Sequence, residues 1–325
     1  MAKPRRLIVN PDLTCYYHVM SRCVRSAMLL LRDSPARQQW LCQRLQLLAE
    51  VFAIEIGGYA VMGNHFHLVV RLEPEAAEGW SDEQVVRRWA RIHPPRDGRW
   101  RPREITEPWV QQQAADRKRV ARLREKLKSL SQFMKDLKQP LAELANREDK
   151  VTGHFWEGRF KSHGILDEAA LLAVCTYVDL NPFRAGLCPK PEDGQYVSLA
   201  ERIEAVRQQQ QQAGDDGTVE PDAGAPVSNG TWLLPIGREK QEQTGSSETE
   251  AGRRRPMFRS MGLRDYLQIV DQMARLWRAG KQALAEGLGP ILDRLGLTEG
   301  RDKLTELMDR LRSGETRLGY AIAVQ

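Results

Sequence analysis

The sequence has few cysteines and no long apolar run, and both shortages exclude classes of protein. No segment approaches the ~20 apolar residues that a membrane-spanning helix needs. The five cysteines are odd in number and include no C-x-x-C pair, so neither a disulfide framework nor a thiolate zinc site is expected. The first residues, MAKPRRLIVNPDL, lack the apolar core of a signal peptide. We therefore expect a cytoplasmic protein with reduced thiols and no membrane contact.

The excess of positively over negatively charged residues is also small. The 325 residues include 49 Lys and Arg against 43 Asp and Glu, which gives a net charge of +6. The chain is 41% hydrophobic and 28% charged, a globular composition for a chain long enough to form two domains. The placement of the basic residues therefore matters more than their number, because a clustered basic face attracts phosphate backbones.

The first 72 residues show a mixed pattern of strands and one helix. Alternation predicts strands over residues 15–23, 53–59 and 65–72, and helical spacing predicts a helix over 36–52. A turn at 62–64 joins the last two strands. This order predicts an α+β domain with an antiparallel hairpin.

The composition changes along the rest of the chain. Residues 73–150 hold two Arg-rich runs and read as a basic helical insertion, with a helix from 130 that Pro140 interrupts. A further helix, with Asp167 as its N-cap, ends before Pro182. We expect one domain over 1–206, a flexible linker over 207–256 that is rich in Gln, Gly, Ser and Glu, and a small helical C-terminal domain over 257–325.

Two histidines stand one residue apart in the predicted strand of GYAVMGNHFHLVV. Residues i and i+2 of a strand point to the same face, so His65 and His67 project together, roughly 6.5–7 Å apart along the strand. They can converge on one metal ion while Phe66 and Leu68 enter the core. The alternative is a pair of solvated or hydrogen-bonded histidines on an exposed face.

The stretch CTYVDLNP carries a second candidate group. Tyr177 and Asn181 are four residues apart and share one helix face. Asn181 is a candidate oxygen ligand beside the histidines; alternatively it merely ends a helix before proline. Two imidazoles and an amide oxygen leave open positions on Mg²⁺ or Mn²⁺, which take phosphate oxygens. A tyrosine there can attack a phosphate and later be displaced by a free hydroxyl, which rejoins two strands in two reversible steps.

Four stretches in order, YHVMSRC, GYAVMGNHFHLVV, FWEGRFKS and TYVDLNPFRAGL, resemble the REP-associated tyrosine transposases of the single-tyrosine HUH superfamily. The resemblance covers roughly residues 14–72 and 130–190. It implies a ferredoxin-like antiparallel sheet with helices on one face and the HUH strand central. It also implies a metal-dependent transposase that cleaves and rejoins single-stranded DNA beside a hairpin through a 5′-phosphotyrosine, acting as a monomer or homodimer.

The resemblance also assigns roles within this chain. Tyr177 corresponds to the nucleophile, His65 and His67 to metal ligands, and Asn181 to a third ligand of Mg²⁺ or Mn²⁺. The long basic insertion and the extension beyond the tyrosine helix depart from the family pattern.

Several other residues are candidate DNA contacts. Arg159 and Lys161 suit phosphates, and Trp156 suits base stacking; the alternative is a partly buried aromatic strand with solvated charges. The insertion adds arginines and tryptophans for a hairpin or single-strand groove: Arg87, Arg88, Arg91, Arg99, Arg101, Trp89 and Trp100. The alternative for these is a solvated helix face whose tryptophans pack inward. His18 is expected to be structural, although it shares a strand face with Tyr16 and Arg22.

Two other functions fit parts of this pattern. One is a non-catalytic regulator that binds DNA or RNA hairpins and derives from such a transposase. The other is a metal hydrolase that uses the two histidines with water as nucleophile. A Tyr177→Phe exchange separates the three functions. It is expected to abolish the activity of a transposase, to leave the affinity of a binder unchanged and to lower the activity of a hydrolase only slightly.

Overall fold

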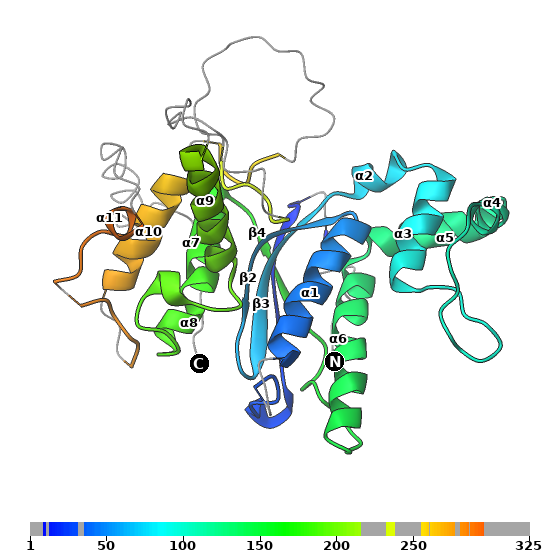
Figure 1. The fold of residues 1–325 in the computed structure, drawn as a ribbon, viewed down its shortest axis with the longest axis horizontal. Coiled ribbons are helices and arrows are strands. Elements are labelled where there is room, and N and C mark those ends of the chain that lie inside the picture. The colour runs from blue at the N-terminus through cyan, green and yellow to red at the C-terminus, as the bar shows by residue number, and fades with distance from the viewer. Residues whose placement is uncertain are drawn as a thin grey trace, which may run out of the picture. The chain divides into compact units, whose positions relative to one another are not determined.

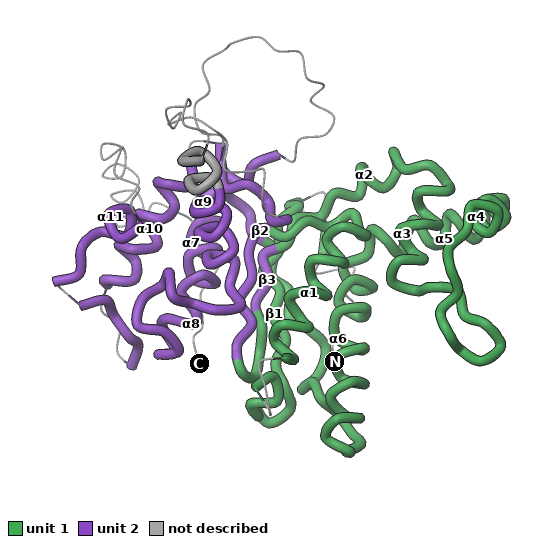
Figure 2. The backbone as a smooth tube through the Cα atoms, viewed as in Figure 1, with its two compact units in different colours: residues 1–56, 63–66, 70–164 green, residues 57–62, 67–69, 165–325 purple. Residues whose placement is uncertain are grey.

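The structure is a computed structural model that describes residues 9–10, 13–31, 36–215, 232–237, 255–259, 261–276, 280–285 and 287–295. The chain divides into two compact units (Figure 2). Unit 1 comprises residues 1–56, 63–66 and 70–164; unit 2 comprises 57–62, 67–69 and 165–325. The division runs through two strands of the sheet.

A four-stranded antiparallel sheet organises the fold (Figure 1). Its strands are β1 (Tyr16–Arg22), β2 (Ile54–Val61), β3 (His65–Leu72) and β4 (Lys161–Ile165), in the order β2-β3-β1-β4. Helix α1 (Ala36–Val51) follows β1, and α6 (Leu130–Glu148) precedes β4. A β-α-β-β-α-β chain with this strand order is ferredoxin-like, and β3, which carries the histidines, is central. The predicted fold class is confirmed.

Backbone hydrogen bonds fix the register of β1 on β3. Leu72 N donates to Cys15 O and Cys23 N donates to Asn64 O, each at 2.8 Å. These two antiparallel pairs place Arg22 opposite His65, in a pair whose side chains share one face. The face to which Phe66 and Leu68 point is apolar and buried.

Helices α1 and α6 of unit 1 pack against each other. The sequence predicted that Pro140 interrupts α6, but the helix continues through it. Proline removes the N–H that would bond to the carbonyl of Asp136. Arg44 of α1 supplies the missing donor, with Nε 3.1 Å from Asp136 O. A contact from another helix therefore compensates for the proline.

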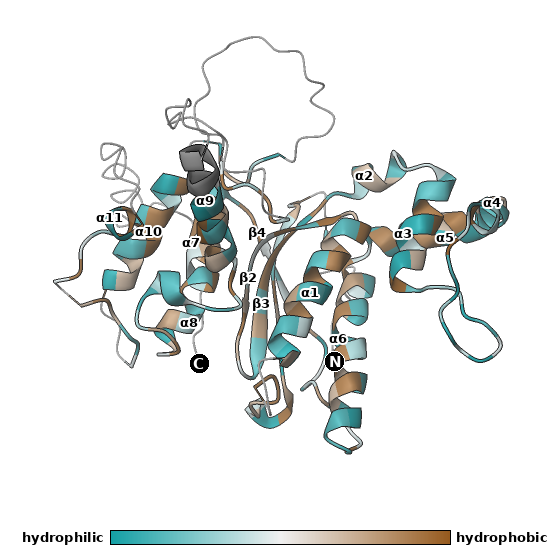
Figure 3. Cartoon of the chain, in the orientation of Figure 1, coloured by the Kyte–Doolittle hydropathy of each residue, from teal (hydrophilic) through white to brown (hydrophobic). Residues whose placement is uncertain are grey.

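Before α6, the basic insertion of unit 1 forms four further helices: α2 (Pro74–Glu78), α3 (Asp82–Ile92), α4 (Glu107–Ala114) and α5 (Arg117–Lys128). Figure 3 shows both apolar and polar residues along α3 and α5. Their buried side chains include Val85, Val86, Val120 and Leu123. A capping box starts α3, in which Ser81 Oγ accepts from Gln84 N and Gln84 Oε1 accepts from Ser81 N.

Unit 2 is mainly helical. Its elements are α7 (Glu168–Asp179), α8 (Asn181–Arg184), η3 (Pro191–Asp193), α9 (Ser198–Asp215), α10 (Leu263–Arg275) and α11 (Ile291–Arg294). Asp167 caps α7 as predicted, since its Oδ1 accepts from Ala170 N at 2.7 Å. Helix α9 continues past the residue-207 boundary expected for the linker. Most of that linker, and the C-terminal domain after residue 295, lie outside the described residues.

The end of β2 pairs with a segment that follows the tyrosine helix. Ala60 of β2 forms an antiparallel bridge with Val197, and Val61 N donates to Tyr196 O at 2.9 Å.

All five cysteines are free thiols, and burial raises the pKa of Cys23 to about 12 and that of Cys188 to about 11. None of the helices in the described part of the chain is long and apolar enough to cross a membrane.

Candidate functional site

Strand β3 presents His65 and His67 on the face opposite to Phe66. His65 is half-buried, and its Nδ1 lies 2.6 Å from Asn64 Oδ1. Burial, and secondly the positive charge of Arg22, lowers the pKa of His65 to about 4. His65 is therefore a neutral imidazole at neutral pH, the form that binds a metal.

His67 is buried and contacts the predicted nucleophile. Its ring centroid lies 5.4 Å from that of Tyr177, with an interplanar angle of 84°. This edge-to-face contact fixes α7 on the His67 side of β3 within unit 2. The imidazole is 1% exposed, whereas Tyr177 is 36% exposed. The contact holds a solvent-accessible tyrosine beside a buried histidine.

Asn181 lies one turn beyond Tyr177, as the sequence predicted. It starts α8, and its Nδ2 donates to the backbone carbonyl of Tyr177 at 3.4 Å. Leu180 between the two helices keeps a right-handed helical conformation, with φ −84° and ψ −4°. The turn is therefore nearly continuous, and Asn181 stays on the side of Tyr177.

His65, His67 and Asn181 are the side chains proposed to bind a divalent metal ion. A bond from His65 Nδ1–H to Asn64 is the kind of outer contact that fixes the tautomer and presents Nε2 as the ligand atom. His65 and His67 share one strand face, and Asn181 belongs to the turn beside Tyr177. Within the described ranges, no three His, Cys, Asp or Glu side chains gather as a metal site. Two imidazoles with amide, water or phosphate oxygens fit Mg²⁺ or Mn²⁺.

A buried carboxylate anchors the tyrosine helix, and it was not among the residues predicted from the sequence. Asp179 is 3% exposed and lies two residues after Tyr177. Its Oδ1 accepts from Ser198 Oγ at 2.5 Å and from Leu199 N at 3.0 Å, and its Oδ2 accepts from Tyr266 Oη at 2.5 Å. Burial raises the pKa of Asp179, although these donors favour its charged form. The carboxylate links α7 to the start of α9 and to α10.

Arg184 makes a second link from the same stretch to the C-terminal part of unit 2. Its Nη1 donates to Gln282 O at 2.6 Å, and its Nη2 donates to Met273 O in the last turn of α10. A guanidinium is favourable there because the unpaired carbonyls of a helix C-terminus carry partial negative charge. Gln282 Nε2 in turn donates to Cys188 O at 3.0 Å.

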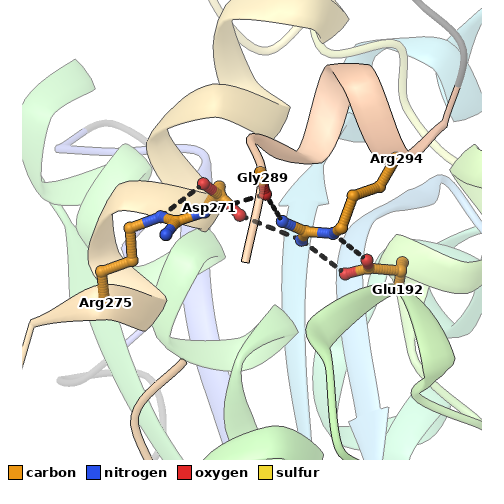
Figure 4. Close-up of polar contacts among 5 residues, drawn as sticks. All are labelled: Glu192, Asp271, Arg275, Gly289 and Arg294. Atoms are coloured by element: carbon orange, nitrogen blue, oxygen red, sulfur yellow. Dashed lines mark hydrogen bonds and ion pairs between the residues drawn. The ribbon is translucent and has the colours of Figure 1, made fainter. Parts of the chain in front are cut away.

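A cluster of ion pairs fixes α11 to the same unit (Figure 4). Arg294 pairs with Glu192 at 2.5 Å and with the buried Asp271 of α10 at 3.0 Å. Arg275 pairs with Asp271 at 2.8 Å, and both arginines donate to the carbonyl of Gly289. Helices α10 and α11 are thus bonded to the segment that follows Tyr177 at several points.

The predicted DNA contacts near β4 occupy different environments. Arg159 and Lys161 are exposed, as phosphate contacts require. Trp156 is 9% exposed; its Nε1 donates to Lys138 O at 3.0 Å, and its ring meets Phe66 edge-on at 5.5 Å. Little of this ring is accessible to an unpaired base, so we do not retain Trp156 as a stacking residue.

The predicted arginines of the insertion also fall into two groups. Those of α3 are engaged within unit 1: Arg87 with Glu107, Arg91 with Glu50, and Arg88 over the ring of Trp80, at 4.0 Å, and on Glu50 O. Arg99 and Arg101 are exposed in the loop between α3 and α4. The structure therefore leaves the loop arginines, rather than those of α3, open to a partner.

His18 is buried, as expected for a structural histidine. It is 5% exposed, and burial, with a smaller contribution from His163, lowers its pKa to about 4. Tyr16, on the same face of β1, lies 3.2 Å from Arg71, which pairs with Glu55 at 2.6 Å.

Comparisons with known proteins give a structural similarity but no match in sequence. No family model matches the chain, and no curated protein matches it closely enough to count as a relative. A solved structure described as a REP-associated tyrosine transposase bound to a REP hairpin is similar, with 12% sequence identity and a TM-score of 0.36. The match covers 73% of this chain and 99% of that one.

Proposed function

We propose that this protein is a metal-dependent strand transferase acting on single-stranded DNA beside a hairpin, with Tyr177 as the nucleophile. The observation that carries the proposal is the contact of the exposed Tyr177 with the buried His67, on the strand that also presents His65. A pure binding module has no need of an accessible tyrosine in contact with a buried histidine. The motifs quoted from the sequence support the same reading.

The chemistry is a pair of phosphoryl transfers. Tyr177 Oη attacks a backbone phosphorus; the new Oη–P bond forms as the P–O3′ bond breaks, and the proton lost by tyrosine balances the one gained by the departing 3′-oxygen. The reverse reaction with another strand's 3′-hydroxyl rejoins DNA. Bound Mg²⁺ or Mn²⁺ supplies stabilisation of the charge that develops on the phosphate. His65, His67 and Asn181 are the proposed ligands, and Asn64 orients His65.

The test is covalent capture. Purified protein is mixed with labelled oligonucleotides that carry a hairpin and a single-stranded flank, with Mn²⁺ or EDTA, and resolved on a denaturing gel. We expect a Mn²⁺-dependent adduct that disappears in Tyr177→Phe and persists in Tyr196→Phe, a half-buried tyrosine outside the motif. Tight binding without an adduct supports the regulator instead. Cleavage that survives Tyr177→Phe supports a hydrolase.

A further inference from the structure

The loop between α3 and α4 has an unusual residue at its tip. Its backbone forms a short hairpin: Asp97 N donates to Arg101 O at 2.9 Å, Trp100 N donates to Asp97 O at 3.0 Å, and Arg96 bridges Pro102. Asp97 Oδ1 also accepts from the backbone N–H of Arg99, at 2.8 Å, and of Arg101, at 2.9 Å. The loop is therefore held in one conformation by its own hydrogen bonds.

Trp100 occupies the position of this turn where glycine or asparagine is usual. It has φ +63°, in the left-handed region that bulky residues rarely adopt. Tryptophan at such a position stabilises a fold when burial compensates for the strain, but here 76% of the side chain is exposed. Its neighbour is Arg96, whose guanidinium lies 5.8 Å from the ring centroid and donates to Trp100 O. The residue type is therefore not explained by folding.

The charge around Trp100 is strongly one-sided. Residues 94–103 contain four arginines and one aspartate, and that aspartate is engaged by the turn. The side chains of Arg99, Arg101 and Arg103 are exposed and have no ion-pair partner in the part of the chain that is described. Of the two acids that follow the loop, Glu104 is exposed and Glu107 is paired with Arg87.

We propose that this loop is a nucleic-acid contact in which Trp100 stacks on an unpaired DNA base and Arg99, Arg101 and Arg103 contact the flanking phosphates. An exposed aromatic face beside unpaired guanidinium groups is the combination that single-stranded nucleic acid requires. Stacking suits any base, so the loop contributes affinity for the unpaired flank more than sequence choice. The identity of the partner rests on the proposed function, but the contact does not require Tyr177 to react.

The experiment measures equilibrium binding in a Tyr177→Phe background, so that cleavage cannot interfere. Trp100→Gly relieves the left-handed strain and removes the ring in one change. We expect an unfolding midpoint that is unchanged or raised, with affinity for a hairpin carrying a single-stranded flank lowered about 5- to 100-fold. Trp100→Phe keeps a stacking face and is expected to retain most of the affinity. A blunt hairpin is expected to bind all three proteins alike.

The phosphate contacts are tested through salt dependence. Replacing Arg99, Arg101 and Arg103 by alanine is expected to reduce the slope of log K against log salt by about 2–3, at roughly 0.7–0.9 for each phosphate that is no longer neutralised. The matched control replaces Arg117, Arg119 and Arg122, which are exposed on α5 of the same insertion. An equal reduction in that control shows a general charge effect and overturns the proposal.

Three further results also overturn it: undiminished affinity in Trp100→Gly, an equal loss on the blunt hairpin, or a loss confined to an RNA version of the flank. If the wild-type protein forms no adduct while the loop variants lose affinity as expected, the cleavage proposal fails and the DNA contact stands.

Discussion

Tyr266 donates its phenolic hydrogen to the carboxylate of Asp179, with 2.5 Å between the oxygens and both side chains buried. Asp179 lies two residues after Tyr177, whereas Tyr266 belongs to α10. The position of the candidate nucleophile therefore depends on a helix that is far from it in sequence.

Removing that hydroxyl is expected to weaken both the fold and the reaction. Tyr266→Phe leaves one oxygen of a buried carboxylate without its donor, which costs about 1.5–3 kcal/mol of unfolding free energy. If the bond positions α7, the rate of adduct formation falls more than the affinity for the hairpin does. Chemical denaturation and single-turnover capture measure the two effects.

Tyr196→Phe is the matched control, since the Tyr196 hydroxyl has no bonding partner among the residues described. A double-mutant cycle that combines Tyr266→Phe with Asp179→Asn isolates the interaction between these two side chains. Additive losses of stability would contradict a direct coupling between these two side chains.

Substitutions of Arg184 are expected to lower the stability of the protein by different amounts. Arg184→Ala removes donors from the carbonyls of Met273 and Gln282 and is expected to destabilise the protein by about 2–3 kcal/mol. Arg184→Lys keeps the charge but not the two-pronged geometry, so it is expected to recover only part of this. Urea denaturation measures both, with Arg207→Ala on the exposed face of α9 as control. Full stability in Arg184→Ala would show that the contact is dispensable.

The proposed metal centre predicts a hierarchy of affinities for Mn²⁺. Alanine at His65 or His67 is expected to abolish measurable binding and metal-dependent capture. Asn64→Ala removes an orienting contact and is expected to weaken binding about 10- to 100-fold. Calorimetric titration with Mn²⁺ measures this, and His163→Ala, at an exposed position of β4, is the control. Equal Mn²⁺ affinity in all these variants would argue against the centre.

The buried His18 predicts a loss of stability in acid. Its pKa is lowered from 6.5 to about 4 in the folded protein. The unfolded chain therefore binds the proton more readily between these values, so stability is complete above about pH 6.5 and declines as the pH falls towards 4. Between pH 7 and pH 5 the contribution of this group is about 2 kcal/mol.

The comparison is the pH dependence of unfolding free energy in His18→Gln and in the wild type. The variant is expected to show a shallower decline, whereas His154→Gln, at an exposed position, is expected to match the wild type. Parallel curves for His18→Gln and wild type would contradict this origin.

Local patterns were sufficient to predict three of the four strands and the tyrosine-bearing helix, whereas β4 was not predicted from alternation. Alternation over His65–Leu72 and the cap at Asp167 involve neighbouring residues, so the sequence displays them directly. The continuation of α6 through Pro140 was not predictable in this way, because the donor that compensates for it, Arg44, comes from another helix.

Local sequence patterns also could not predict which side chains contact one another. Nothing near Tyr177 in the sequence indicates that Tyr266 bonds its helix, and the burial of Trp156 depends on Phe66 in another element. The arginines of α3 look like a solvated basic run, but their acidic partners lie 20 and 41 residues away. Asp179 and Arg184 both stand in the stretch TYVDLNPFRAGL, which was the one sequence signal of their importance.

The bridge between Ala60 and Val197 bears on how copies of this chain can associate. The sheet ends in β2 on one side and β4 on the other. An outer strand offers backbone groups to which another chain can add, but Tyr196 and Val197 already occupy those of Ala60 and Val61. Any dimer built by extending the sheet from one copy to the next would therefore be directed to β4, at the opposite end.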